Sequence, residues 1–131
     1  MSPRSEGGWA RTGKSFSTYV LPKSGASPVC RYYLAPPAGD THFFGRGTEE
    51  CNAVGRANQG FVLEDAGFMY MFLPASGACP ADTVRVYRVF SNRADVNHRY
   101  MTDDAVRADM VAKGWLAEGD GADLVAMCAP R

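Results

Sequence analysis

Short stretches in which apolar and polar residues alternate dominate the pattern along this chain. Residues 31–34 and 85–90 are rich in aromatic and β-branched side chains, which favour strands. Because successive side chains of a strand point to opposite faces, we expect Tyr87 to point away from Arg88, so that one of the two faces outward. Residues 68–73 are apolar on both faces, which predicts a strand in the middle of the core.

A helical pattern follows later in the chain. Val106 and Met110 lie four residues apart and therefore share one face of a helix. Asp103 or Thr102 is placed to accept backbone N–H groups at the start of this helix, and Gly114 stands where a helix end favours a left-handed residue. A second short helix is expected to begin near Thr48, because two acidic residues follow in its first turn, where the helix dipole favours them.

The same order of motifs occurs twice. Residues 29–74 and residues 84–130 each have the pattern of strand, turn, strand, short helix, turn and strand, and residues 8–21 match the last part of each unit. The aligned residues are Arg31 with Arg88, Tyr33 with Phe90, His42 with His98, Phe44 with Tyr100, Gly60 with Gly114, and Glu64 with Glu118. One unit cannot bury its own apolar strand, so the copies should pack on one another. The sequence therefore predicts a single α+β domain over residues 1–131, a compact repeat domain of mainly antiparallel short strands with one short helix per repeat.

Composition and charge restrict the partners of this domain. The chain has 131 residues, enough for one domain with a real core, and its 14 basic and 14 acidic residues give a formal net charge of +0. These charges are interspersed, so nothing indicates a nucleic-acid partner. No apolar run approaches the roughly 18 residues of a membrane span. The start of the chain lacks a signal-peptide pattern but opens within a repeat, so we expect a piece of a longer exported protein with a neighbouring partner domain.

Four cysteines are widely spaced along the chain, at Cys30, Cys51, Cys79 and Cys128. None belongs to a Cys-x-x-Cys pair, which argues against a zinc site or a thioredoxin-type motif. An even number of cysteines suits two disulfides in an oxidising compartment, and the sequence leaves three pairings open. We favour Cys30–Cys51 and Cys79–Cys128, because each bridge would staple one repeat. The alternative is a set of four buried thiols.

These motifs resemble a bacterial family of secreted-protein repeats of unknown function. Its units have the form V-Y-R-F-Y-N, then H-F-Y-T-T, then G-W-x-x-E-G, and the match here lies in residues 86–90, 97–102 and 114–119. The cysteines resemble those of a four-cysteine subgroup of this family. The chain departs from the pattern at Phe61, where the family has Trp, and at Asp65, where it has Gly. The resemblance implies an extracellular or cell-surface accessory module and assigns no catalytic residue.

The two histidines, His42 and His98, are the first candidates for chemistry. Each follows a turn that contains a carboxylate, Asp40 or Asp95, and a His beside an Asp is typical of a base or a metal ligand. Their equivalent positions in the two repeats favour a structural role instead, in which the imidazole bonds to the turn and locks a hairpin. We expect no metal and no cofactor, because a metal site needs three or four convergent ligands.

Two glutamates, Glu64 and Glu118, also occupy equivalent positions, each in the last part of its repeat. Arg31 and Arg88 are the natural partners of these carboxylates, so we predict a salt bridge between the first and third strands of each unit. A catalytic pair of carboxylates, as in glycoside hydrolases, is the alternative that this pattern favours less.

Aromatic side chains give the stronger functional signal, because Tyr and Trp present a flat apolar ring with a polar tip on which sugar rings stack. The residues that we expect to contact a ligand are Tyr32, Tyr87, Arg88, His42, His98 and Trp115. If they do not contact a ligand, the aromatic members of this set belong to the core. We therefore expect a non-catalytic extracellular module that binds a surface polymer such as glycan or peptidoglycan. The alternatives are a structural or protein–protein interaction cap on a secreted hydrolase and a small hydrolase that uses one His.

Overall fold

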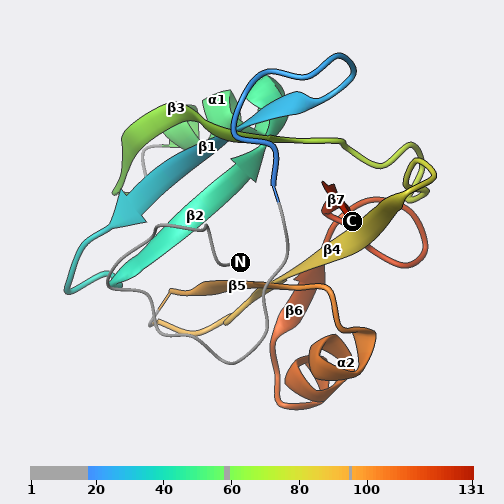
Figure 1. Ribbon diagram of the computed structural model, residues 1–131. Coiled ribbons are helices and arrows are strands. Elements are labelled where there is room, and N and C mark those ends of the chain that lie inside the picture. Colours follow the sequence, from blue (N-terminus) through green and yellow to red (C-terminus); the bar gives the residue numbers. More distant parts are fainter. Residues whose placement is uncertain (1–17, 58–59, 95) are drawn as a thin grey trace.

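The computed structural model describes residues 18–57, 60–94 and 96–131, so part of the half-unit expected at residues 8–21 lies outside it. Two small antiparallel sheets lie between two helices, with one helix on each outer side (Figure 1). This arrangement confirms the predicted α+β fold. The elements are β1 (Ser27–Leu34), β2 (Thr41–Arg46), α1 (Gly47–Ala57), β3 (Phe61–Met71), β4 (Thr83–Phe90), β5 (His98–Met101), α2 (Asp104–Ala112), β6 (Leu116–Glu118) and β7 (Met127–Pro130).

The first sheet has β1 at its centre, with β2 along one edge and β3 along the other. The pairing of β3 with β1 contains a bulge at Glu64, because Tyr32 lies opposite Leu63 whereas Arg31 lies opposite Asp65. A bulge changes the direction in which a side chain leaves the strand. Here it places the carboxylate of Glu64 against the guanidinium of Arg31.

The second sheet repeats this plan with one difference. β4 is central and β5 follows one edge, but the other edge is shared by β6 and β7. Arg88 lies opposite Glu118 on β6, and Val86 lies opposite Met127 on β7. The single long strand of the first half is thus split in the second half. The prediction that residues 124–128 form its last strand is wrong in extent, because a turn occupies the beginning of this segment and the strand starts at Met127.

The prediction for residues 68–73 also needs a correction. Residues 68–71 belong to β3, an outer strand of its sheet, and they contribute to the main core as expected, but not on both faces to the same extent. Met69 and Met71 are fully buried, whereas Phe68 and Tyr70 are only partly buried. One face of the strand is therefore fully buried in the core, while the other is partly exposed, with Phe68 packed against the edge of the core.

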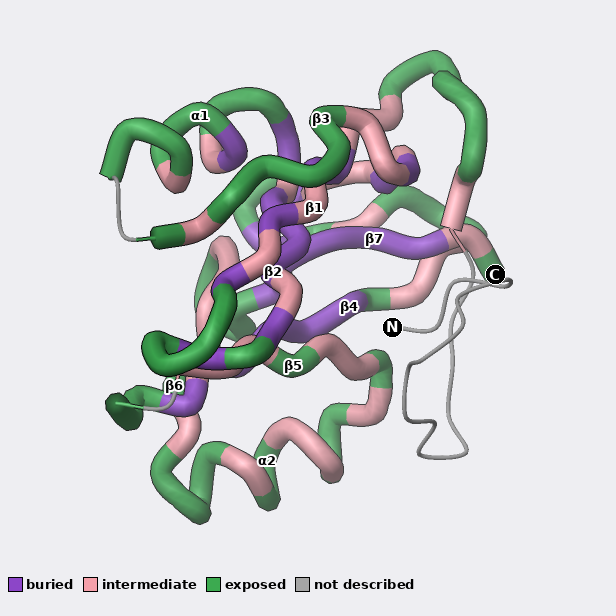
Figure 2. Tube along the Cα trace, turned by 90° about the vertical axis from the view of Figure 1, so that its left-hand side faces the viewer, coloured by how far each residue is buried: buried purple, intermediate pink, exposed green. Residues whose placement is uncertain are grey.

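The main core lies between the two sheets, where the tube in Figure 2 is coloured as buried. Its fully buried members come from both halves: Val29, Phe44, Met69, Met71, Val86, Ala126, Met127 and Ala129. A second, smaller cluster lies between the first sheet and α1, and consists of Cys30, Tyr32, Phe43 and Cys51. Neither half thus buries its apolar strand alone.

Two disulfides pin the elements together, Cys30–Cys51 and Cys79–Cys128, as predicted. The first bridge ties α1 to the central strand of its sheet. It passes so close to Gly45 that a Cβ atom at this position would lie 2.6 Å from Sγ of Cys30 and 2.8 Å from Sγ of Cys51. Only glycine leaves room for the bridge at this point of β2.

The ends of α2 follow the sequence signals. The side chain of Asp103 accepts hydrogen bonds from the backbone N–H groups of Ala105 and Val106, which confirms it as the N-cap. Gly114, just after the helix, has a φ of 104°, a value that a residue with a side chain rarely adopts. In the part of the chain that the structure describes, no helix is long and apolar enough to cross a membrane.

Candidate functional site

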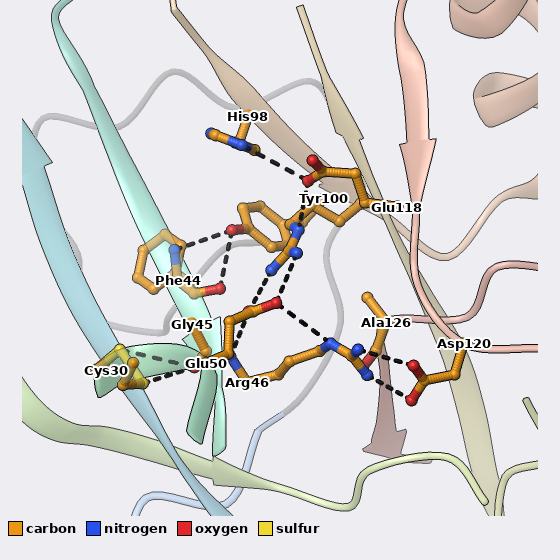
Figure 3. A network of polar contacts seen from close by, with 12 residues as sticks. Cys30, Phe44, Gly45, Arg46, Glu50, His98, Tyr100, Glu118, Asp120 and Ala126 are labelled. Carbon is orange, nitrogen blue, oxygen red and sulfur yellow. Dashed lines mark hydrogen bonds and ion pairs between the residues drawn. A yellow bond between two sulfur atoms is a disulfide. The ribbon is translucent and has the colours of Figure 1, made fainter. Parts of the chain in front are cut away.

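A chain of ion pairs joins the two halves of the protein (Figure 3). Its centre is Arg88 on β4, whose side chain is only 6% exposed. The Nη1 and Nη2 atoms of Arg88 donate to Oε1 and Oε2 of Glu50 on α1 at 2.6 and 2.9 Å. Its Nε donates to Oε1 of Glu118 on β6 at 2.9 Å, which confirms the predicted salt bridge within the second half. Two carboxylates, one from each half, thus neutralise one buried guanidinium.

Arg46, the last residue of β2, extends this chain to the far side of the second half. Its Nη1 and Nη2 donate to the carboxylate of Asp120 at 2.7 and 2.8 Å, and Nη1 also donates to the carbonyl oxygen of Ala126. Its Nε lies 3.5 Å from Oε2 of Glu50, and its backbone N–H donates to Oε1 of the same carboxylate. Figure 3 shows Arg46 and Glu50 side by side between the sheets.

The charges in this network are fixed at neutral pH. Burial opposes the charged form of Glu50, but the hydrogen bonds and charge of Arg88 more than offset it and hold the pKa of Glu50 below its usual value. The hydrogen bonds from Arg46 likewise lower the pKa of Asp120. Burial raises the pKa of Tyr100, whose hydroxyl donates to the carbonyl of Phe44 at 3.0 Å and accepts from its N–H at 2.9 Å. The network therefore joins the two halves through charged groups of opposite sign.

His98 lies beside this network, and its side chain is 9% exposed. Its Nε2 is 3.6 Å from Oε1 of Glu118, which is beyond hydrogen-bond distance. Burial and the charge of Arg88 lower the pKa of His98 to about 4, so the imidazole is neutral at pH 7. The rings of Phe43 and Phe90 hold it in place, with centroids 4.8 and 5.1 Å away. His98 is thus largely buried among aromatic rings, which argues against the expected contact with a ligand.

The low pKa of His98 predicts a loss of stability in mild acid. The unfolded chain binds a proton at this residue near pH 6.5, whereas the folded chain does so only near pH 4. The unfolded state therefore gains protons first as the pH falls, and the free energy of unfolding should drop by about 2 kcal/mol between pH 7 and pH 5. Urea unfolding at both pH values measures this drop, and His98→Gln should reduce it. An equal drop in the His98→Gln variant would contradict the assignment.

The same three residue types meet at the equivalent place in the first half. Nε of Arg31 donates to Oε1 of Glu64 at 3.0 Å, which confirms the second predicted salt bridge. Nε2 of His42 lies 3.1 Å from the same oxygen. We call Arg31, His42 and Glu64 the open triad, and Arg88, His98 and Glu118 the closed triad.

The two triads differ in their access to solvent. The side chains of Arg31 and His42 are 23% and 31% exposed, against 6% and 9% for Arg88 and His98. In the closed triad, α1 of the other half presents Glu50 to the guanidinium. The open triad is the place where the same geometry faces solvent.

Aromatic and acidic side chains adjoin the open triad. The ring of Tyr33 lies 5.2 Å from that of His42, and its hydroxyl donates to Oδ1 of Asp40 at 2.6 Å. This hydrogen bond raises the pKa of Tyr33. The guanidinium carbon of Arg31 lies 4.5 Å from the centre of the Phe68 ring. Rings, carboxylates and a guanidinium thus converge on one partly exposed surface.

Two of the expected ligand-binding aromatics lie in the interior instead. Tyr32 and Tyr87 are each 5% exposed, so the prediction that they form an outward stacking face is wrong. The hydroxyl of Tyr32 donates to the carbonyl of Cys51, and the guanidinium of Arg107 lies over the Tyr87 ring at 4.0 Å. Arg88, placed by the sequence opposite Tyr87, is buried as well, because Glu50 of α1 covers its face of β4 while Arg107 of α2 covers the face of Tyr87.

Trp115, the remaining candidate, precedes β6 in the second half and is partly exposed. The guanidinium groups of Arg93 and Arg99 lie over its ring at 5.4 and 5.6 Å. Two arginine side chains thus pack on the ring that was expected to contact a ligand.

Two contacts of this site were not predicted from the sequence. His42 was expected to contact the turn residue Asp40. In the structure His42 contacts Glu64 instead, and Asp40 accepts a hydrogen bond from Tyr33. The sequence also gave no signal for the contact of Glu50 with Arg88, because these residues belong to different repeats. Within the described ranges, no group of three or more His, Cys, Asp or Glu side chains is arranged to hold a metal ion.

A shallow hollow of about 460 Å³ lies elsewhere, beside the Cys79–Cys128 bridge. It is open and lined in part by Arg85, Tyr87 and Arg131. Nη1 of Arg85 is paired with the carboxylate of Asp123 at 3.2 Å. The open triad offers the better-organised set of polar groups.

Comparison with known proteins shows a family match for this chain. A family model described as "Domain of unknown function (DUF5648)" matches residues 2–124. A search of curated proteins and a search of solved structures found no match.

Proposed function

The chain belongs to the DUF5648 family, a domain of unknown function, and we propose that it is a non-catalytic extracellular module that binds a surface glycan such as peptidoglycan. The binding surface in this proposal is the open triad with Tyr33 and Asp40. The observation that supports it most is the pair of equivalent triads, of which one is closed by the fold and the other faces solvent.

The chemistry of this surface suits a sugar. The rings of Tyr33 and His42 are adjacent and offer apolar area against which a pyranose ring packs. The carboxylates of Asp40 and Glu64 can accept hydrogen bonds from sugar hydroxyls, and the guanidinium of Arg31 can donate hydrogen bonds to the oxygens of such hydroxyls. A small number of placed polar groups beside apolar rings is the usual composition of a ligand site.

The closed triad argues against catalysis at the open one. His98 occupies the position equivalent to that of His42, yet it is neutral, largely buried and held by aromatic rings. An arrangement of residues that also occurs where no substrate can reach it has a structural role there. Binding is therefore the simplest activity for its exposed copy.

The two disulfides support the extracellular part of the proposal. Such bridges form and persist in oxidising compartments and are rare in the cytosol. A module tethered to another domain also gains from weak binding, because linkage raises the effective concentration of the polymer.

Retention on polymers tests this function. The oxidised chain should bind insoluble peptidoglycan or a member of a polysaccharide panel saturably, and Tyr33→Ala should weaken that binding by about tenfold, because the variant loses the ring beside His42. Tyr19→Ala is the matched control, since Tyr19 is also partly exposed but packs against Phe72.

The remaining outcomes separate the alternatives. No retention on any polymer would overturn the proposal and favour a structural cap, which should instead raise the stability of a neighbouring domain. Turnover of a glycan that disappears in His42→Ala would show a hydrolase.

A further inference from the structure

We propose that the ligand of the open triad carries a carboxylate, which binds the two terminal nitrogens of Arg31 as Glu50 binds those of Arg88. This inference rests on the proposed function and names the chemical class of its ligand. It predicts acidic sugars, or sugars that bear an acidic substituent, in preference to neutral ones.

The closed triad provides the template. Arg88 uses Nε for the carboxylate of its own repeat, Glu118, and uses Nη1 and Nη2 for the carboxylate of Glu50, which comes from the other repeat. The guanidinium is planar, and this two-point contact with a carboxylate is the strongest arrangement that it makes. The second carboxylate in this site therefore comes from outside the repeat that holds the arginine.

The open triad repeats the first of these contacts and leaves room for the second. Nε of Arg31 donates to Glu64 at 3.0 Å, the counterpart of the Arg88–Glu118 bond. Among the residues that the structure describes, none accepts a hydrogen bond from Nη1 or Nη2 of Arg31. Phe68 lies over one face of the guanidinium, so a ligand approaches these nitrogens in the plane of the group.

The position of the rings defines the rest of the ligand. Tyr33 and His42 lie next to the arginine on the same surface, so a pyranose ring beside the carboxylate would pack against them. Uronic acid polymers have this combination, and so does peptidoglycan, in which carboxylates are linked to the sugar chain. The shared feature is a carboxylate next to a sugar ring.

Matched pairs of polymers test the inference. Polygalacturonate should bind at least about tenfold more tightly than its fully methyl-esterified form, which has the same sugar chain without the charge. Native peptidoglycan should likewise bind more tightly than peptidoglycan whose carboxylates have been converted to amides. The pair that shows the difference identifies the source of the carboxylate.

The variant Arg31→Gln should abolish the preference within the pair. This substitution removes the two terminal N–H donor groups that would bind the carboxylate. Arg56→Gln is the control, because it removes the same charge from the exposed end of α1. Higher salt should also reduce binding of the acidic polymer by the wild-type chain, since the site is partly exposed.

The outcomes distinguish this inference from the function on which it rests. Equal binding of both members of each pair, unchanged in Arg31→Gln, would show that the ligand does not bind through a carboxylate. The proposed function of glycan binding would then still stand. Binding to none of these polymers nor to the neutral panel would overturn the function itself.

Discussion

Replacing Arg88 with Ala should lower the free energy of unfolding by about 3 to 5 kcal/mol. The substitution leaves Glu50 and Glu118 without the guanidinium that neutralises both of them. Glu50 then keeps only its contacts with Arg46 in a largely buried site between the halves. The loss of one partner of a buried ion pair is expensive because the remaining charge stays desolvated. Urea unfolding of the oxidised protein at pH 7 measures the effect.

Arg31→Ala is the matched control, because it removes the equivalent residue of the other repeat. Arg31 is 23% exposed against 6% for Arg88, and its partner Glu64 is 34% exposed against 24% for Glu50, so water can solvate the carboxylate that remains and the loss should stay below about 1 kcal/mol. Equal losses for Arg31→Ala and Arg88→Ala would contradict the distinction between the open and the closed triad.

Removing the Cys79–Cys128 bridge should destabilise the chain by about 4 kcal/mol, since the two cysteines are 49 residues apart. The bridge connects the segment before β4 to β7, and so limits the freedom of almost the whole second half in the unfolded state. The double variant Cys79→Ser with Cys128→Ser tests this by urea unfolding.

The other bridge gives a comparison of the same kind. Cys30 and Cys51 are 21 residues apart, and the shorter loop predicts about 3 kcal/mol from loop closure. A loss below about 1 kcal/mol for the Cys79–Cys128 double variant would show that other contacts already restrain the second half.

Several features of the fold could be predicted because they depend on residues within one repeat. The pairing of Arg31 with Glu64 followed from the alignment of the two copies, as did the favoured disulfides. The N-cap at Asp103 and the glycine after α2 follow from local backbone chemistry. Such signals act over short distances or within one unit, so the sequence carries them.

The contacts between the repeats could not be predicted in this way. Glu50 had an adequate local explanation as an acidic residue in the first turn of α1, yet its carboxylate binds Arg88 of the other half. Tyr87 had an alternation pattern that places it opposite Arg88, but alternation does not say whether the second face is covered. Here α2 brings Arg107 over the Tyr87 ring, and both faces of β4 are buried.

The break between β6 and β7 shows the same limit. The apolar residues from 124 to 128 suggest one strand, but Leu124 has a φ of 51° and belongs to a turn. The bridge between Asp120 and Val125 closes this turn, and Asp120 is the residue that receives Arg46 from the first half. The interruption thus serves a contact between repeats, which periodicity within one repeat does not reveal.

The central claim is that one arrangement of Arg, Glu and His holds the fold together in one half and binds a ligand in the other. The most direct test is to measure both the affinity for polygalacturonate and the free energy of unfolding of Arg31→Gln beside the wild-type chain. The account predicts a loss of affinity of at least about tenfold with a change in stability below about 1 kcal/mol. Unchanged affinity, or a loss of stability as large as that of an Arg88 variant, would contradict it.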